Sequence, residues 1–144
     1  MEAQDAGTLV PDNFTQLEPG WGFNDLLAPI YSCDDEGSLD WGFVVLDKHC
    51  NAMGSCHGGV LLTFMDIALG RGIWERLGRV KGLPTINLSM DFVSAGQKGE
   101  WLRAEIDEPD IKNSFGFTSG RVMCGDRLVA RATGVFRVYR GDKA

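Results

Sequence analysis

The sequence predicts an α+β fold in which a curved antiparallel β-sheet wraps around one long central helix. The stretch from His57 to about Leu77 places apolar residues at helical spacing, over a length that exceeds a typical strand. Beyond Pro84 the pattern changes, and apolar residues alternate with polar ones as they do in half-buried strands. The links between these later segments are short, which favours antiparallel pairing, and a twisted sheet can curl around a buried helix.

The composition is that of a single globular domain. The chain has 144 residues, of which 44% are hydrophobic and 24% are charged. This balance suffices for a core that needs no metal or disulfide. The net charge of −6 disfavours nucleic-acid binding, which depends on Lys and Arg neutralising phosphates. We therefore expect no nucleic acid among the partners.

The N-terminal part carries few structural signals. Residues 1–20 are polar and without a sustained period, so we expect a lead-in arm, followed by a short helix near Phe23–Leu27. The first seven residues lack the basic and apolar regions of a signal peptide, and no run approaches the roughly 18 apolar residues of a membrane span. We expect no membrane partner and a cytoplasmic protein whose four cysteines are reduced thiols.

The middle of the chain predicts a strand, a turn and then the helix. Trp41–Asp47 is expected to form the strand, and His49–Ser55, which contains Asn and Gly, the turn. Gly78 and Gly82 mark the exit of the helix that follows. Apolar residues recur along this helix at Leu61, Met65, Ala68, Leu69, Ile73 and Leu77. Other apolar residues fill its remaining sides, so we expect burial on most faces.

Four strands are predicted after the helix. They cover Ile86–Phe92, Leu102–Ile106, Phe115–Met123 and Leu128–Arg140, and the turn Cys124–Asp126 joins the last two. Residues 94–96 and 107–110 are expected to be loops. A sheet that covers one helix leaves its other face and its edge strands uncovered, which suggests that the protein forms oligomers.

Two glycines at the predicted helix start are candidate oxyanion donors. Gly58 and Gly59 have no side chains, so a ligand carbonyl can approach the backbone, and the first amides of a helix have no intrahelical acceptor. Donors preset around a forming oxyanion can lower an acyl-transfer barrier by roughly 3–4 kcal/mol. The alternative is that both glycines only fit a tight turn against the sheet.

Asp66 is a candidate base because it lies inside the apolar stretch of the predicted helix. A carboxylate among apolar side chains is costly unless it is paired or used. The alternatives are an exposed Asp, or one that pairs with Arg71 or Arg103. If Asp66 and Gly58 act together, their spacing matters, because eight residues along a helix separate them by about 12 Å. Two antiparallel helices of a two-fold dimer would bring Asp66 of one copy beside Gly58 of the other.

Three more polar residues lie near these two, and each has an ordinary structural alternative. Asn51 offers an amide before the helix but is also a common turn residue. His57 at the helix start is suited to bind a carbonyl, to act in catalysis or to cap the helix. Thr85 begins the next strand, where a hydroxyl can hold a water, although Thr is common in strands.

Other kinds of site are not supported by the sequence. The pairs His49–Cys50 and Cys56–His57 do not match a zinc site, because five residues separate the cysteines and no second ligand pair follows. Cys56 has no evident partner triad that would make it a nucleophile. The chain also lacks a Walker-type glycine loop and a dinucleotide fingerprint. We expect no metal and no other cofactor.

The pattern resembles the hotdog-fold acyl-CoA thioesterases, in particular the PaaI-like branch of the phenylacetate pathway. The resemblance rests on Asn51-x-x-Gly54-x-x-His57-Gly58-Gly59 followed by Asp66, and on the downstream strand 85–93 with the loop Ser94–Gly96. It covers roughly residues 36–140, which we expect to form the hotdog thioesterase domain after a lead-in segment of residues 1–35.

The resemblance implies homodimers, often paired into tetramers, that hydrolyse acyl-CoA thioesters without a metal at sites across the dimer interface. It makes Asp66 the base or nucleophile and the Gly58 amide the group that polarises the thioester carbonyl. The other implied site residues are Asn51 and His57, which would help to hold the substrate, Thr85, which would orient water, and Gly59, Ser94 and Gly96, which would contact the substrate. Many relatives have Pro after the serine of the downstream loop, whereas this chain has Ala95, so the CoA contacts are not specified.

We therefore predict a cytoplasmic acyl-CoA thioester hydrolase that releases a free acid and CoA. Attack by water and direct attack by Asp66 through an anhydride both remain open, as does the identity of the acyl group. One alternative is an enoyl-CoA hydratase or dehydratase on the same fold, although such enzymes pair a His with a carboxylate and this chain has only His49 and His57. The other alternative is a non-catalytic acyl-CoA or lipid-binding module.

Overall fold

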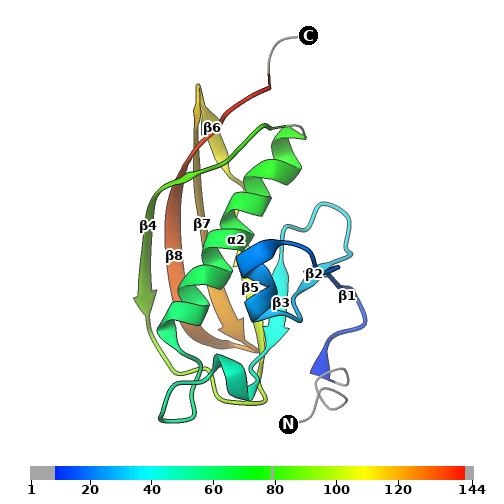
Figure 1. Ribbon diagram of the computed structural model, residues 1–144, viewed down its shortest axis with the longest axis vertical. Coiled ribbons are helices and arrows are strands. Elements are labelled where there is room, and N and C mark those ends of the chain that lie inside the picture. The colour runs from blue at the N-terminus through cyan, green and yellow to red at the C-terminus, as the bar shows by residue number, and fades with distance from the viewer. Residues whose placement is uncertain (1–8, 79, 142–144) are drawn as a thin grey trace.

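The protein is a curved antiparallel β-sheet wrapped around one long helix, which confirms the predicted hotdog fold (Figure 1). The computed structural model describes residues 9–78 and 80–141. The part of the predicted lead-in that falls on residues 1–8 lies outside the described residues. In the described ranges, no helix combines the length and the apolar character needed to cross a membrane.

Eight strands and three helical segments make up the described chain. The strands are β1 (Phe14–Gln16), β2 (Tyr31–Cys33), β3 (Trp41–Val44), β4 (Thr85–Phe92), β5 (Trp101–Ile106), β6 (Asp110–Lys112), β7 (Phe115–Cys124) and β8 (Arg127–Arg137). The helices are the 3-10 turns η1 (Gly22–Leu27) and η2 (Asp47–His49) and the α-helix α2 (Gly58–Leu77). The sheet order is β1-β2-β3-β5-β7-β8-β4, and β6 pairs with β7. All of these strand pairs are antiparallel.

The predicted elements are present, with shifted ends, and three short strands and the turn η2 are added. The first predicted strand ends at Val44 rather than Asp47, because the chain turns there into η2. The last strand ends at Arg137 rather than Arg140. The strands β1, β2 and β6 were not predicted, since three residues are too few to establish an alternating pattern. Two of them, β1 and β2, place part of the N-terminal segment in the same sheet as the rest of the chain.

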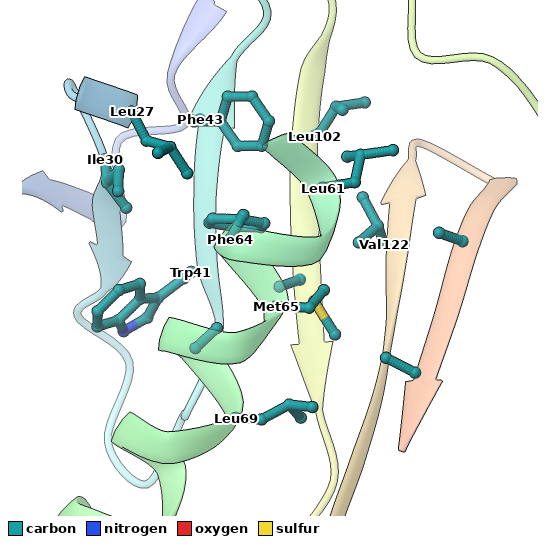
Figure 2. Packing of buried hydrophobic residues seen from close by; sticks show 14 of the residues in the cluster. Leu27, Ile30, Trp41, Phe43, Leu61, Phe64, Met65, Leu69, Leu102 and Val122 are labelled. Carbon is teal, nitrogen blue, oxygen red and sulfur yellow. The ribbon is translucent and has the colours of Figure 1, made fainter. Parts of the chain in front are cut away.

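One face of α2 packs into the concave side of the sheet and forms the core. Phe64 packs against Phe43 of β3 with ring centroids 4.7 Å apart, and Met65 and Leu69 of the helix are fully buried beside it (Figure 2). On the opposite side of the helix, Leu62 and Trp74 remain 38% and 39% exposed. Most other residues of α2 are buried or half-buried, as expected, so the uncovered part of the helix in a single chain is a limited strip.

Close contact between the helix and the sheet requires a position without a side chain. A Cβ atom built on Gly120 of β7 would lie 2.6 Å from the Glu105 carbonyl oxygen and 3.2 Å from the Met65 methyl group. A backbone oxygen cannot move away as a flexible side chain can. Glycine at this position therefore allows β7 to pack closely against both β5 and α2.

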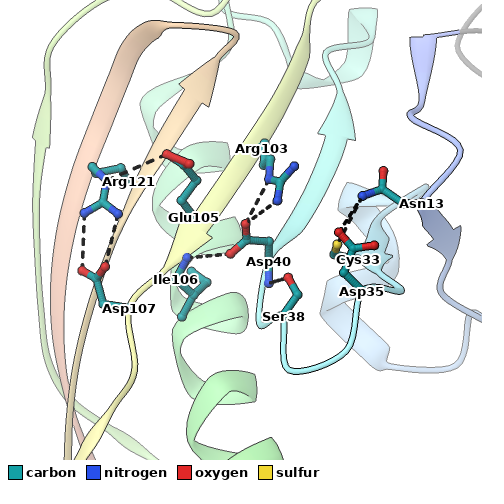
Figure 3. A network of polar contacts seen from close by, with 10 residues as sticks. All are labelled: Asn13, Cys33, Asp35, Ser38, Asp40, Arg103, Glu105, Ile106, Asp107 and Arg121. Carbon is teal, nitrogen blue, oxygen red and sulfur yellow. Dashed lines mark hydrogen bonds and ion pairs between the residues drawn. The ribbon is translucent and has the colours of Figure 1, made fainter.

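Charged pairs cover the convex face of the sheet (Figure 3). Asp40, which precedes β3, accepts hydrogen bonds from Arg103 Nε and the Ile106 amide of β5, both at 2.9 Å. Beside them, Arg121 of β7 contacts Asp107 at 3.2 Å and Glu105 at 3.9 Å. The exposed Arg121 pairs contribute about 0–1 kcal/mol each, so the apolar concave side remains the main source of stability.

A buried histidine connects the segments that lead into α2. His49 is 1% exposed, and its Nδ1 accepts the Leu46 amide at 3.0 Å while its Nε2 donates to the Leu27 carbonyl at 2.9 Å. Its own carbonyl accepts the His57 amide at 2.8 Å. Both ring nitrogens are thus used in the neutral form, and burial lowers the pKa of His49 below 6.5. The ring and the carbonyl of His49 together therefore link η1, η2 and the start of α2.

We expect His49→Gln to weaken the fold but to flatten its dependence on pH. Gln keeps an acceptor and a donor without titrating. In the wild type the unfolded chain binds the His49 proton first, so stability is retained above about pH 6.5 and falls as the pH drops toward the lowered pKa. Urea unfolding midpoints should be lower for His49→Gln at neutral pH, yet fall less between about pH 6.5 and pH 5.

The exposed histidine supplies the control for this measurement. His57→Gln should keep the wild-type loss of stability on acidification, because the buried imidazole of His49 is still present. Equal slopes for the wild type and His49→Gln would contradict the role assigned to His49.

Candidate active site

The middle of α2 and the start of β4 meet at a carboxylate and a hydroxyl. Thr85 Oγ1 donates a hydrogen bond of 2.6 Å to Asp66 Oδ1. The alternative pairings of Asp66 are not present, because Arg71 contacts Glu75 at 2.8 Å and Arg103 contacts Asp40 at 2.8 Å. Asp66 is half-buried and Thr85 is exposed, so the pair faces accessible space. A hydroxyl that orients a carboxylate in this way is suited to hold a water molecule beside it.

A cleft of about 430 Å³ lies beside this pair. It is lined by Trp21, Asn24, Trp41, Asp66, Ile67, Gly70, Arg71, Trp74, Leu83, Thr85 and Phe136. Trp21 and Asn24 were not predicted as part of a site, and they come from the N-terminal segment around η1. The sequence did contain one indication of this contribution. Trp21 is a large aromatic residue in an otherwise polar stretch, and such a residue is usually at least partly covered by other parts of the chain.

Further along α2 from Asp66, the cleft is lined by an arginine that lies between two tryptophan rings. The Arg71 guanidinium lies 5.6 Å from the ring centroid of Trp21 and 5.6 Å from that of Trp74. Along the helix axis, Arg71 follows Asp66 by about 7.5 Å and Trp74 follows it by about 12 Å. The cleft therefore extends from the carboxylate along about two turns of α2 and ends at an indole, a guanidinium and a second indole.

The start of α2 presents one amide without an acceptor. His57 is the N-cap residue, and its Nδ1 accepts the Gly59 amide at 2.8 Å. The Val60 and Leu61 amides bond to the His57 carbonyl at 2.9 and 3.2 Å. Within the described part of the chain, the Gly58 amide has no such partner. Of the first helical amides, Gly58 is thus the one left available to a ligand, where the helix dipole favours negative charge.

Gly58 faces a second hollow, which has a volume of about 460 Å³. The rest of its lining is Cys56, Leu61 and the run from Phe92 to Gly96. Ser94 Oγ donates to the Leu128 carbonyl at 2.7 Å, and the Gly96 carbonyl accepts the Cys56 amide at 2.7 Å. The predicted site residues Gly58, Ser94 and Gly96 therefore come together, and these two hydrogen bonds fix the loop beside the helix start.

Asn51 and His57 both stabilise the backbone in this region. Asn51 Oδ1 accepts the amides of Met53 and Ser55 at 2.9 and 3.2 Å, and its Nδ2 donates to Ser55 Oγ at 3.1 Å. His57 caps α2 with Nδ1, which leaves its Nε2 as the ring nitrogen that is free of the cap. The turn and the cap were the alternatives expected for these residues, and both are formed.

In one chain the two groups of candidate residues are separate. Asp66 and Thr85 line the first cleft, Gly58, Ser94 and Gly96 line the second hollow, and no residue lines both. The eight residues of α2 between Gly58 and Asp66 keep these two about 12 Å apart along the axis. A single carbonyl group cannot contact both at once in an isolated chain.

Cys56, directly before the helix start, is not an activated thiol. Burial raises the pKa of Cys56 to about 12, and the nearby Cys50 adds to the shift, so Cys56 is protonated at neutral pH. All four cysteines are free thiols. Among residues 9–78 and 80–141, no group of three His, Cys, Asp or Glu side chains is arranged to hold a metal ion.

Comparison with known sequences identifies related proteins. The model of a family described as the thioesterase superfamily matches residues 53–131. A Pseudomonas aeruginosa protein, provisionally named an esterase, is 32% identical over 130 residues, which cover 90% of this chain and 97% of that protein. An Archaeoglobus fulgidus protein named in the same way is 30% identical over 106 residues, covering 73% of this chain and 66% of that protein.

Solved structures share the fold at lower identity. Zebra fish thioesterase superfamily member 2 has a TM-score of 0.70 at 18% identity, covering 83% of this chain and 87% of its own. A hypothetical thioesterase of Streptococcus pneumoniae, solved with coenzyme A, has a TM-score of 0.62 at 21% identity and coverages of 71% and 82%. A variant of the phenylacetic acid degradation protein PaaI of Thermus thermophilus has a TM-score of 0.61 at 24% identity and coverages of 68% and 83%. At these identities the likeness concerns the fold.

Proposed function

The chain belongs to the thioesterase superfamily, and from this premise we propose that it hydrolyses acyl-CoA thioesters to a free acid and CoA. The observation that carries the proposal is the hydrogen bond between Thr85 and Asp66 in a cleft large enough for an acyl group. The likeness to the Streptococcus thioesterase solved with coenzyme A supports the choice of substrate class. The proposed site also requires an oxyanion donor and a second copy of the chain.

In the proposed reaction, water attacks the carbonyl carbon of the thioester. Asp66 takes the proton from this water, and Thr85 holds the carboxylate in the orientation that its hydrogen bond fixes. The carbonyl oxygen gains negative charge and accepts the Gly58 amide, which has no partner in the described chain. When the tetrahedral intermediate collapses, the C–S bond breaks, and the leaving sulfur of CoA takes the proton that Asp66 removed from the water, so that CoA leaves as the thiol and Asp66 is again a carboxylate. Direct attack by Asp66 through a mixed anhydride is the variant of this mechanism.

A dimer is proposed to bring Asp66 and Gly58 together. β4 is an edge strand of the sheet, and Ile86 and Phe92 on it are 58% and 53% exposed. Leu62 on the neighbouring face of α2 is also exposed. A second copy that covers this apolar surface would satisfy the edge strand and place two α2 helices antiparallel. The Gly58 amide of one copy then faces Asp66 of the other, and pairing of such dimers would give a tetramer.

The proposed dimer assigns the two hollows to the two parts of the substrate. The acyl group lies in the cleft beside Asp66, where three tryptophans and Phe136 supply apolar contacts. The thioester and the CoA side lie toward the partner's helix start, against the loop that carries Ser94 and Gly96, while Gly59 lines a neighbouring hollow together with His57. Asn51 and His57 support this loop and helix start through the turn and the cap, and offer Nδ2 and Nε2 to the substrate.

We expect Asp66→Asn and Asp66→Ala to lower kcat by at least about 100-fold, because they remove the base. Thr85→Val, which removes the hydroxyl but keeps the shape, should lower kcat by about tenfold, and Thr85→Ser should restore most of it. The measurement is release of free thiol from a panel of acyl-CoA esters, with circular dichroism to check the fold. Near wild-type rates for both Asp66 variants would refute the assignment.

Gly58→Pro tests the oxyanion donor by removing a single N–H group. Proline is favoured at the first helical position, and His57 has φ −62° and ψ 134°, the extended conformation that a following proline requires. We expect Gly58→Pro to lower kcat by about 100-fold or more relative to Gly58→Ala, which keeps the amide. Gly58→Ala is the matched control, because both variants place a Cβ atom at position 58, about 3.3 Å from the Phe92 ring, and only Gly58→Pro removes the N–H group. Equal rates for the two variants would contradict the donor role.

Mixing these variants tests whether the site is shared. In a dimer of one Asp66→Asn chain and one Gly58→Pro chain, one site has both intact residues and the other has neither. Random pairing should therefore restore about a quarter of the wild-type activity from two nearly inactive proteins. The two chains would be co-expressed with different tags and the activity compared with that of each variant alone. A site contained in one chain gives no restoration.

Trp21→Ala tests the position of the acyl group. Removing the indole opens the far end of the cleft, so longer acyl chains should gain about tenfold in kcat/KM relative to shorter ones, the effect of burying about two more methylene groups. Tyr139→Ala is the control, because Tyr139 and Trp21 are both 50% exposed but Tyr139 does not line the cleft. If Trp21→Ala hydrolyses the same chain lengths as the wild type, the acyl group lies elsewhere. If the wild type hydrolyses no acyl-CoA ester at all, the proposed function itself is refuted.

A further inference from the structure

Two cysteines lie directly opposite each other in the turn that leads into α2. Cys50 and Cys56 form an isolated antiparallel bridge. On either side of them, the Asn51 amide bonds to the Ser55 carbonyl and the His57 amide bonds to the His49 carbonyl, both at 2.8 Å. Cys50 and Cys56 are therefore the non-hydrogen-bonded pair of this short ladder, the kind whose Cα atoms are about 4.5 Å apart.

The same arrangement brings the two side chains together. Residues directly opposite in an antiparallel pair point to the same face, and a spacing of about 4.5 Å lies inside the Cα range that a disulfide spans. Cys56 packs in the core with its Cβ beside Gly96, and Cys50 packs against the same core. The effect of Cys50 on the pKa of Cys56 agrees with this proximity. Neither thiol has a strong partner, since their contacts are to the carbonyls of Leu46 at 3.4 Å and His57 at 3.8 Å.

We propose that Cys50 and Cys56 form a dithiol that low-molecular-weight disulfides such as glutathione disulfide convert into an intramolecular disulfide. The oxidised pair would close the turn around Asn51 and fix the segment that presents the Gly58 amide. The site is independent of the proposed hydrolysis, because it rests on the ladder at residues 49–57 alone.

The reaction has two exchange steps and a defined order. The Cys50 thiolate attacks one sulfur of glutathione disulfide, which forms a mixed disulfide and releases one glutathione thiolate. Cys56 then loses its proton and attacks the Cys50 sulfur, which forms the intramolecular bond and releases the second glutathione. Two thiols are oxidised and one glutathione disulfide is reduced to two thiols, so electrons and atoms balance. Cys50 reacts first because it is partly exposed, whereas Cys56 is buried and protonated.

The test uses the folded full-length chain with Cys33→Ser and Cys124→Ser, so that only the pair can react. Incubation with glutathione disulfide should lower the intact mass by two hydrogen atoms, raise the Tm by about 5 °C as expected for closing a short loop, and be reversed by dithiothreitol. Peptide mapping should place the bond between Cys50 and Cys56. The same treatment in urea, where the ladder is absent, should give mainly mixed disulfides.

Single replacements test the order of the steps. On the same background, Cys56→Ser should accumulate one glutathione on Cys50, while Cys50→Ser should leave Cys56 unmodified in the folded protein. A folded protein that keeps both thiols free, or that carries only mixed disulfides when both cysteines are present, would overturn the proposal. Modification of Cys56 before Cys50 would overturn the assigned order.

Discussion

A helix leaves its first amides without acceptors, and the way this chain satisfies them determines the character of its candidate site. His57 takes the Gly59 amide with its ring and two later amides with its carbonyl, while the Gly58 amide has no acceptor among residues 9–78 and 80–141. His57 is itself held by His49, which is buried and bonded to two other segments. The free amide is therefore presented by a rigid arrangement, which is what an oxyanion donor requires.

The packing of α2 against the sheet places the second candidate group at a fixed distance from the first. The buried face of the helix fixes its rotation, so Asp66 is directed to the side where β4 begins and Thr85 can reach it. The same rigidity keeps Asp66 and Gly58 of one chain apart. Thus the interactions that position each group also prevent one chain from using both on the same carbonyl, and the proposed dimer resolves this conflict.

Much of this arrangement was predictable because it depends on local patterns. Helical and alternating spacing predicted α2 and the long strands within a few residues, and the N-cap and turn residues were found at the expected places. Asp66 stood out as an acid in an apolar stretch. Helical spacing alone offers Arg71 a partner in Glu75, four residues further along α2, whereas the pair of Arg103 with Asp40 depends on the tertiary structure.

What sequence did not reveal depends on contacts between distant segments. The strands β1, β2 and β6 have three residues each, too few for a period, and they exist because longer strands offer them a partner. The place of Trp21 in the cleft depends on how η1 packs near α2. Likewise, the opposed cysteines are separated by a turn whose shape Asn51 sets, so the six-residue spacing alone gave no sign of a pair.

Trp21 lies outside residues 53–131, the part of the chain that matches the family model, while Asp66 and Gly58 lie inside it. The segment between β1 and β2 is also the kind of surface loop that tolerates insertion and exchange more readily than a packed helix. Relatives that keep the same helix start and the same acid are therefore free to acquire different loops at this position. Diversification of substrate range would then proceed by loop replacement, with the hydrolytic groups left untouched.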